Sequence, residues 1–210
     1  MTQAYSSDVA FSPSVKAVQA SKGLRPAYAR IEESGGWQTE ITPDLAAFIG
    51  AQTSVFFATA SAGGQPYIQH RGGPAGFLRV LDEKTIAFVD FAGNRQYITQ
   101  GNLAENPKAY LFLIDYAHRR RVKLWGEARV VEDDDELIAR LMPQDYKARP
   151  EQVILFTLAA WDTNCQQHIP QRFDAEDVAQ MLMVRGRRIA ELEAEIERLR
   201  AGAATVTSGE

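Results

Sequence analysis

Three short basic segments stand out in a chain whose overall charge is negative. "HRGG" (residues 70–73) and "GNRQ" (residues 93–96) each place an arginine close to a glycine, and "RRRVK" (residues 119–123) places four basic residues in five positions. An arginine guanidinium is a planar fork of donors that matches the oxygens of a phosphate, and a neighbouring glycine lets a ligand approach the backbone. Together these segments favour an anionic ligand.

Arg71 is expected at the end of a strand over residues 66–71. It could contact a phosphate or a flat ring through its guanidinium. Equally, Gly72-Gly73-Pro74 could form a bulge or tight corner where the strand bends, with Arg71 in solvent. The residues by themselves leave both interpretations open.

The other two basic segments have similar alternatives. "GNRQ" follows a predicted strand and is expected to open a helix, where free backbone N–H groups favour an anion and Arg95 would be a second phosphate ligand. A Gly-Asn start is also common for helix capping alone. On the strand predicted for "RRRVK", Arg119, Arg121 and Lys123 should share one face, which would bind an anion or form a solvated edge.

A polar and aromatic segment, "WDTNCQQHIPQRF" (residues 161–173), follows the last predicted strand. Cys165 and His168 suggest a nucleophile or a metal site. However, there is no second cysteine and no acidic or histidine cluster with zinc spacing, so neither role is expected and no metal is predicted. The wall of a binding pocket is the favoured interpretation.

Strand-like sequences dominate the middle of the chain and must position these residues. Six strands are expected, over residues 54–61, 66–71, 85–91, 109–116, 121–132 and 152–161. The first two should form a hairpin across "AGGQ". Short helices are expected after Thr42, before Pro107 and from Asp133. Without repeating β-α-β units, this order predicts an α+β fold, an antiparallel barrel with covering helices.

Four parts are predicted along the chain: an N-terminal leader that packs on the barrel (residues 1–44), the barrel domain (45–172), a C-terminal helix (173–200) and a disordered tail (201–210).

In the predicted C-terminal helix, apolar residues recur with the spacing of a coiled-coil seam that Arg185 interrupts: Val178, Leu182, Ile189, Leu192, Ile196 and Leu199. A partner helix or the chain's own domain could cover this seam.

Composition excludes several classes of protein. The chain has 210 residues, 45% of them hydrophobic, and a formal charge of −4. This charge argues against a nucleic-acid or membrane-surface binder. One cysteine excludes an intrachain disulfide, and the sequence lacks a secretory signal and a long apolar run, so a cytoplasmic protein is expected. A Walker A pattern and a G-x-G-x-x-G turn are also absent.

Over residues 45–161 the sequence resembles the pyridoxamine 5'-phosphate oxidase-like family of FMN-binding split barrels. "QPYIQHRGGPAGFLRVLDEKTIAFVDFAGNRQ" resembles the paired strands and helix start that hold the flavin phosphate in that family. "NLAENPKAYLFLID" resembles its helix-Asn-Pro-strand signature, and "RRRVKLWGEARVV" resembles the later strand that approaches the flavin ring. The resemblance implies an antiparallel split β-barrel.

The resemblance also implies cofactor-binding residues: His70, Arg71, Gly72, Val89, Asp90, Asn94, Arg95, Gln96 and Arg121. Arg71 and Arg95 would bind the phosphate with help from Asn94, and four residues (His70, Gly72, Val89 and Asp90) would lie along the flavin. Gln96 stands where the oxidases have a phosphate-binding lysine, and Arg121 stands where they have a glutamine near the ring.

The C-terminal segment with which the oxidases bind pyridoxal phosphate is absent, so oxidation of vitamin B6 is not expected. "NCQQHIPQRF" instead resembles a pattern in another branch of the family. The resemblance implies an FMN-dependent oxidoreductase acting on an unidentified small substrate, working as a homodimer with FMN at the interface. Catalytic residues are not assigned; Trp161, His168 and Arg172 are candidates for the substrate side. The alternatives are a non-catalytic flavin- or haem-binding or sensor protein, and a deazaflavin-dependent reductase.

Overall fold

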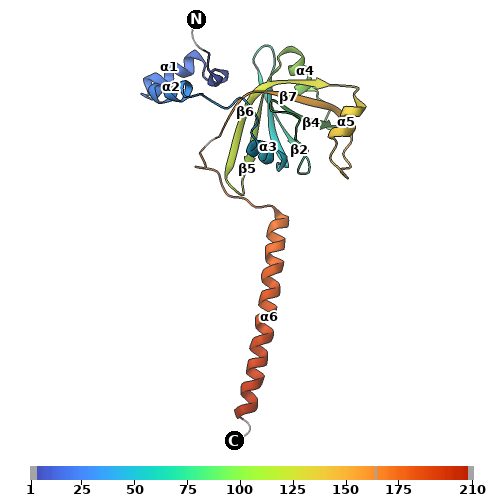
Figure 1. Ribbon diagram of the computed structural model, residues 1–210. Helices are drawn as coiled ribbons and strands as arrows, with labels where there is room; N and C mark the ends of the chain where they lie inside the picture. The colour runs from blue at the N-terminus through green and yellow to red at the C-terminus, as the bar shows by residue number, and fades with distance from the viewer. Residues whose placement is uncertain (1–3, 164, 208–210) are drawn as a thin grey trace. The chain divides into compact units, whose positions relative to one another are not determined.

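The structure is a computed structural model that describes residues 4–163 and 165–207 (Figure 1). Its centre is one antiparallel sheet with the strand order β2-β1-β5-β6-β7-β4-β3. The strands are β1 (Ser54–Ala60), β2 (Pro66–Gly72), β3 (Arg79–Val80), β4 (Thr85–Phe91), β5 (Lys108–Asp115), β6 (Arg120–Val131) and β7 (Pro150–Thr163). All six predicted strands are present, and the two-residue β3 is an addition.

The helices are η1 (Ser6–Val9), α1 (Pro13–Ser21), α2 (Arg25–Glu33), α3 (Pro43–Gly50), α4 (Ile98–Glu105), α5 (Asp135–Leu141) and α6 (Ala175–Thr207). Three of the described helices, α1, α3 and α5, begin at a short polar side chain that caps them. The Thr42 hydroxyl accepts a hydrogen bond from the backbone N–H of Leu45 at 3.3 Å, with Pro43 in the first turn. This is the start that the sequence predicts, because such a cap satisfies a free backbone donor.

Side chains alternate along the strands between a buried interior and a partly exposed outer face. In β1, Val55 and Phe57 are fully buried, while Phe56 between them is only partly covered. The predicted hairpin is present, with Val55 opposite Arg71 and Phe56 opposite His70. Successive residues of β2 therefore also point to opposite faces of the sheet.

The two ends of the strand order meet through side chains. β2 is the last strand at one end, and β4 is next to last at the other. Arg71 Nη1 on β2 nevertheless lies 2.7 Å from Asp90 Oδ1 on β4. Within the described residues no backbone ladder joins these two strands. The sheet thus curls into an antiparallel split barrel, which confirms the predicted fold class.

The N-terminal leader contacts the outer face of the barrel. Trp37 stacks on Trp125 of β6, with ring centroids 4.6 Å apart and planes inclined by 17°. The Lys123 ammonium lies 5.5 Å from the first ring and 5.2 Å from the second. Nearby, Gln38 forms an isolated antiparallel bridge to Trp161 of β7. These contacts hold the leader on β6 and β7.

The chain divides into two compact units. The first comprises Met1–Asp115 and Arg119–His168, and the second comprises Tyr116–His118 and Ile169–Glu210. Most of the second unit is α6, which continues past the predicted helix end at Arg200. Residues 201–207 of the expected disordered tail are helical, and 208–210 lie outside the described residues. Among the described helices, none has the length and apolar character needed to cross a bilayer.

Candidate functional site

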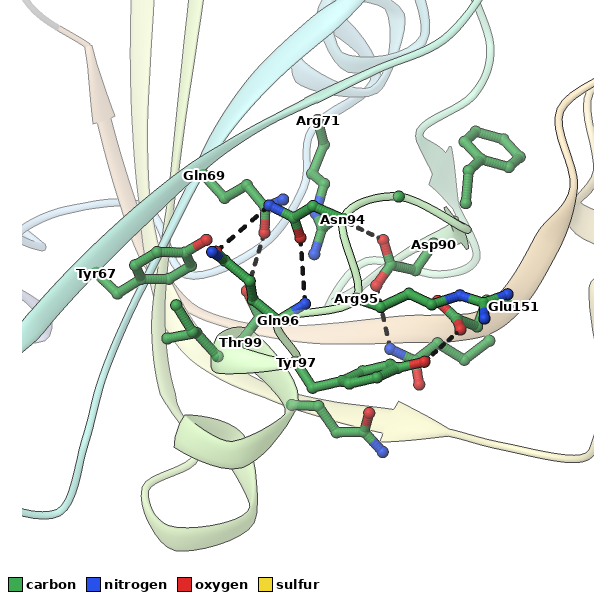
Figure 2. Close-up of a pocket in the computed structure, with 15 residues that line it drawn as sticks. Tyr67, Gln69, Arg71, Asp90, Asn94, Arg95, Gln96, Tyr97, Thr99 and Glu151 are labelled. Carbon is green, nitrogen blue, oxygen red and sulfur yellow. Dashed lines mark hydrogen bonds and ion pairs between the residues drawn. The ribbon is translucent and has the colours of Figure 1, made fainter.

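A small pocket lies where β2, β4 and β7 meet the loop that leads into α4 (Figure 2). Its lining includes five of the predicted cofactor residues: Arg71, Asp90, Asn94, Arg95 and Gln96. Its volume is about 40 Å³, which is room for about three water molecules. A phosphate group matches this size, whereas a flavin ring is much larger.

The α4 end of the pocket is anchored to the barrel by hydrogen bonds. The Asn102 side-chain amide donates to the buried Thr59 hydroxyl of β1 at 3.0 Å. The Thr99 hydroxyl lies 3.4 Å from Gln69 Oε1 on β2. These contacts fix the first turns of α4 against the two strands, so the loop before the helix is held over the pocket.

The central contact of the pocket is the ion pair between Arg71 and Asp90. Their side chains are only 16% and 7% exposed, and Gln152 donates to the second carboxylate oxygen of Asp90 at 3.1 Å. Arg71 points into the pocket between Gln69 and Asp90 (Figure 2). Asp90 Oδ1 accepts no well-directed hydrogen bond, so its 2.7 Å contact with Arg71 is mainly electrostatic.

Burial dominates the ionisation of Asp90. It raises the pKa of this carboxyl above the usual value of 3.8, and the Arg71 charge and the Gln152 hydrogen bond oppose the rise without cancelling it. Removal from water penalises the charged carboxylate more than these contacts stabilise it. Burial of this ion pair therefore lowers the stability of the folded chain.

Arg71 keeps part of its donor capacity free. Its Nε is buried and has no hydrogen-bond partner among the described residues, while Nη1 faces Asp90. A guanidinium binds planar or tetrahedral oxyanions through paired N–H groups on one edge. An unpartnered buried donor is costly, and a phosphate oxygen at the Nε edge would satisfy it.

The loop before α4 has an unusual backbone. Arg95 and Tyr97 have φ angles of 55° and 53°, in the left-handed region that residues other than glycine rarely adopt. The Asn94 side chain accepts from the Gln96 N–H at 3.3 Å, and the Tyr97 hydroxyl donates to Glu151 at 2.8 Å. Residues held in this region are enriched at functional sites, and four further non-glycine residues of the described chain also adopt it.

This loop corrects one prediction about the helix start. α4 begins at Ile98 and its N-terminal flanking residue is the left-handed Tyr97, so "GNRQ" precedes the helix and does not open it. Arg95 is exposed, and no salt bridge to it occurs in the described part of the chain. Its charge is available to a ligand from the loop rather than from the helix terminus.

The formal charges that line the pocket cancel. Arg71 and Arg95 contribute two positive charges, and Asp90 and Glu151 contribute two negative ones. Gln96 adds amide groups without charge. The donors that line the pocket and are available to a phosphate are the free edge of Arg71, the Arg95 guanidinium and the Asn94 amide, in a site of zero net formal charge.

Two predicted ring contacts lie on the other face of the sheet. His70 follows the strand alternation to the outer face, where its ring meets Phe56 edge-on at 5.7 Å. Arg121 pairs with Ile114 across β5 and β6 and alternates with the buried Val122. Neither residue lines the pocket. Arg119, expected on the same face as Arg121, instead lies in the turn before β6 with a φ of 52°.

Contacts within the chain account for the presence of Gly72, Gly73 and Val89 at their positions. A Cβ at Gly72 would lie 3.1 Å from the His70 ring and 3.3 Å from a backbone oxygen, and one at Gly73 would lie 2.7 Å from Phe77. The corner interpretation therefore accounts for both glycines, while Arg71 remains the ligand candidate. The Val89 side chain is buried in an apolar cluster with Leu141, so only its backbone could contact a ligand.

Of the three substrate-side candidates, Trp161 and His168 do not line this pocket, and Arg172 belongs to the second unit. Trp161 donates from its indole N–H to the Glu40 carbonyl at 2.8 Å, a contact that fixes the leader. His168 is exposed, with a φ of 63°. Within that second unit, the Arg172 guanidinium lies 4.6 Å from the centre of the Tyr116 ring.

Sequence reasoning missed several residues of the pocket. Tyr67 and Gln69 line it because they alternate with Arg71 on β2. The period of two in that strand could have identified both. Glu151 comes from β7, far along the chain, and no local signal indicates that it meets Tyr97.

Comparison with known proteins gives one family match. The family model described as pyridoxamine 5'-phosphate oxidase matches residues 41–165. No curated protein matches the sequence. Among solved structures, HupZ from Group A Streptococcus is similar, with 21% identity over 63% of this chain and 99% of that chain and a TM-score of 0.49.

Two further structures are similar at low identity. A putative pyridoxamine 5'-phosphate oxidase from Lactobacillus delbrueckii has 22% identity over 60% of this chain and 95% of its own, with a TM-score of 0.45. An FMN-binding protein from Syntrophomonas wolfei has 11% identity over 70% and 97%, with the same TM-score of 0.45. Because the family model covers more than half of the sequence, the chain belongs to the pyridoxamine 5'-phosphate oxidase-like family.

Proposed function

We propose that the protein binds FMN with the phosphate in the pocket between β2 and α4, and that it is a flavin-dependent oxidoreductase acting on a small substrate. The observation that carries the proposal is the buried, unpartnered Nε of Arg71 at a phosphate-sized pocket. Family membership supports FMN as the source of the phosphate. When bound, the flavin would supply the electron or hydride transfer.

The residues of the pocket would have distinct roles. The Nε edge of Arg71 would donate to phosphate oxygens while Asp90 holds the guanidinium at Nη1. Arg95 would supply the second positive charge from the strained loop, and the Asn94 amide would add a neutral donor. With Gln96 in place of a lysine and Asp90 and Glu151 nearby, the phosphate would be held mainly by directed hydrogen bonds.

A homodimer is part of this proposal, because the pocket is too small for the ring. The ring would lie outside the pocket, where a second protomer could cover it. The outer face of β1, β2, β5 and β6 suits such a partner: Phe56, Tyr110 and Phe112 are only partly covered, and Ile68 is 59% exposed. His70 and Arg121 lie on this same face. A self-complementary apolar surface is typical of a twofold interface.

Replacing the phosphate ligands tests the cofactor assignment. Arg71→Ala and Arg95→Ala should each weaken FMN binding by about 1.5–3 kcal/mol, since each removes a charge-assisted hydrogen bond. The matched control is Arg129→Ala, at an exposed arginine of β6 that does not line the pocket. Calorimetric titration with FMN gives the affinities. If a folded Arg71→Ala protein binds FMN as tightly as the wild type, the assignment of the pocket is wrong.

Turnover separates an enzyme from a binding protein. The FMN-loaded protein should be reduced by NADPH or NADH and should pass electrons to an acceptor, measured by bleaching of the flavin absorbance. A protein that binds FMN but undergoes no reduction would be a non-catalytic flavin binder. Mass spectrometry of the copurifying cofactor separates FMN from haem and from a deazaflavin.

A further inference from the structure

The helix α6 carries a row of apolar side chains without cover. Ile189 is 56% exposed, Leu192 45%, Ile196 47% and Leu199 65%. The helix has 33 residues, and helices in water obtain most of their stability from packing of an apolar face. A face of this kind on a long helix indicates a partner.

The spacing of the row identifies the geometry of that partner. Steps of four and three residues assign a heptad with Leu182, Ile189 and Ile196 at a, and Val178, Arg185, Leu192 and Leu199 at d. Over its second half the seam has isoleucine at every a position and leucine at every d position. In parallel coiled coils, β-branched residues at a with leucine at d favour two strands.

The charges beside the seam complement a second copy of the same helix. In this register Arg188 and Glu195 occupy g positions, and Glu193 and Arg200 occupy e positions. A parallel, in-register pair brings each g residue to the e residue five positions later on the partner. Arg188 then meets the partner's Glu193, and Glu195 meets the partner's Arg200, so both pairs are of opposite charge.

Within one chain Arg188 and Glu195 already take part in helical ion pairs. Arg188 lies 2.9 Å from Glu191, and Arg198 contacts Glu195. All four side chains are largely exposed, so these pairs contribute little to stability and leave the groups free to reorient. Dimerisation would exchange or share partners without burying an unpaired charge.

We propose that α6 forms a parallel, in-register, two-stranded coiled coil with α6 of a second copy of this chain. Its most regular part runs from Ile189 to Leu199. Arg185 places a cation at a d position opposite the same residue of the second copy, which lowers the stability of the coil, and its long side chain can extend to solvent. This interface depends only on α6, so it does not rest on the proposed binding of FMN.

Cross-linking of the full chain tests the orientation. Leu199→Cys is introduced together with Cys165→Ser, so that the new thiol is the only one. A parallel coil brings the two Cys side chains together near one end, and diamide, a mild oxidant, should join the chains at least about tenfold faster than in the control Glu197→Cys, which lies off the seam. Equal cross-linking rates in the two proteins would contradict the parallel coiled coil. An antiparallel pair would also give this result, because it keeps the two thiols apart.

Charge reversal tests the register. Arg188→Glu places like charges opposite each other at two symmetric positions and should slow cross-linking of the Leu199→Cys protein several-fold. Adding Glu193→Arg restores opposite charges and should restore the rate. Failure of the double variant to recover would contradict the in-register pairing, and so would a rate unaffected by Arg188→Glu. These positions are exposed, so the substitutions leave the barrel folded.

Discussion

Arg71 and Asp90 illustrate how one buried pair can serve both the fold and a ligand. Asp90 holds one end of the guanidinium and closes the barrel between β2 and β4. The same contact reduces the positive charge that a phosphate would meet. Asp90 orients the Arg71 guanidinium and also competes with the phosphate for it. Substitutions of Asp90 should therefore change both the affinity for the ligand and the stability of the fold.

The raised pKa of Asp90 predicts a pH dependence of stability. Because the folded-state pKa lies above the usual 3.8, the folded chain retains this proton longer than the unfolded chain as the pH rises. The wild type should therefore lose stability relative to Asp90→Asn as the pH increases from about 4 through the folded-state pKa. Urea unfolding of both proteins at a series of pH values measures this difference. A constant difference across the series would contradict the raised pKa.

Asp90→Asn should also strengthen binding of the anion. The amide keeps a polar group beside Arg71, but the formal charge of the pocket rises from zero to one positive charge. We expect FMN to bind about threefold to tenfold more tightly, as measured by calorimetry at neutral pH. Glu127→Gln, at an exposed acid of β6, is the control. Weaker binding in Asp90→Asn would show that orienting Arg71 matters more than the competing charge.

At the scale of elements, local signals predicted most of the fold. The alternation in β1 and β2 identified a hairpin, and Thr42 with Pro43 identified the start of α3. The two-residue β3 was missed because so short a strand has no measurable period. The start of α4 was misplaced because the left-handed turn uses Arg95 and Tyr97, whereas sequence patterns expect glycine or asparagine there.

Two glycines predict opposite effects of the same substitution. A Cβ at Gly126, where the pairing of β6 and β7 shifts register, would lie 2.1 Å from the Thr157 carbonyl oxygen. Gly126→Ala should therefore cost about 3 kcal/mol or more of unfolding free energy. At Gly101 in α4, no atom outside the adjacent residues and the surrounding helix backbone lies within 4 Å of the added carbon, and Gly101→Ala should stabilise by about 0.4–1 kcal/mol. Thermal and urea unfolding measure both; similar effects at the two sites would contradict this account.

At the scale of the whole molecule, two contacts with a second copy are proposed: one through the outer face of the sheet and one through the seam of α6. If both engage the same partner, each raises the effective concentration of the other. The dimer should then be much tighter than either contact alone provides, without any further interface.

This linkage predicts how the dimer responds to the loss of either surface. Truncation after Phe173 removes α6, and Ile68→Glu places a charge on the outer face. Each change should raise the dimer dissociation constant by a factor of about 10²–10⁴, and the two together should give a monomer in sedimentation velocity. Val18→Glu, at an exposed apolar residue of α1, is the control. A truncated chain whose dissociation constant is unchanged would exclude α6 from the dimer.

Local sequence patterns predicted only part of the candidate site. Arg71 precedes Gly72 and Arg95 lies two residues after Gly93, which is a pattern visible in the sequence. Asp90 was predicted only through the family resemblance, and Glu151 was missed, because their contacts with Arg71 and Tyr97 depend on how the sheet brings together β2, β4 and β7 from distant parts of the chain. Side chains alternate between the two faces of the sheet along β2, so His70 and Arg71, which are adjacent in sequence, lie on opposite faces.

The stacked pair of Trp37 and Trp125 has an optical consequence. Two indoles in near-parallel contact couple their electronic transitions, so together they should give a split circular dichroism band that neither ring gives alone. One ring belongs to the N-terminal leader and the other to β6. Release of the leader would abolish the band while the strands stay folded, so the protein carries its own spectroscopic reporter of whether its N-terminal segment is docked.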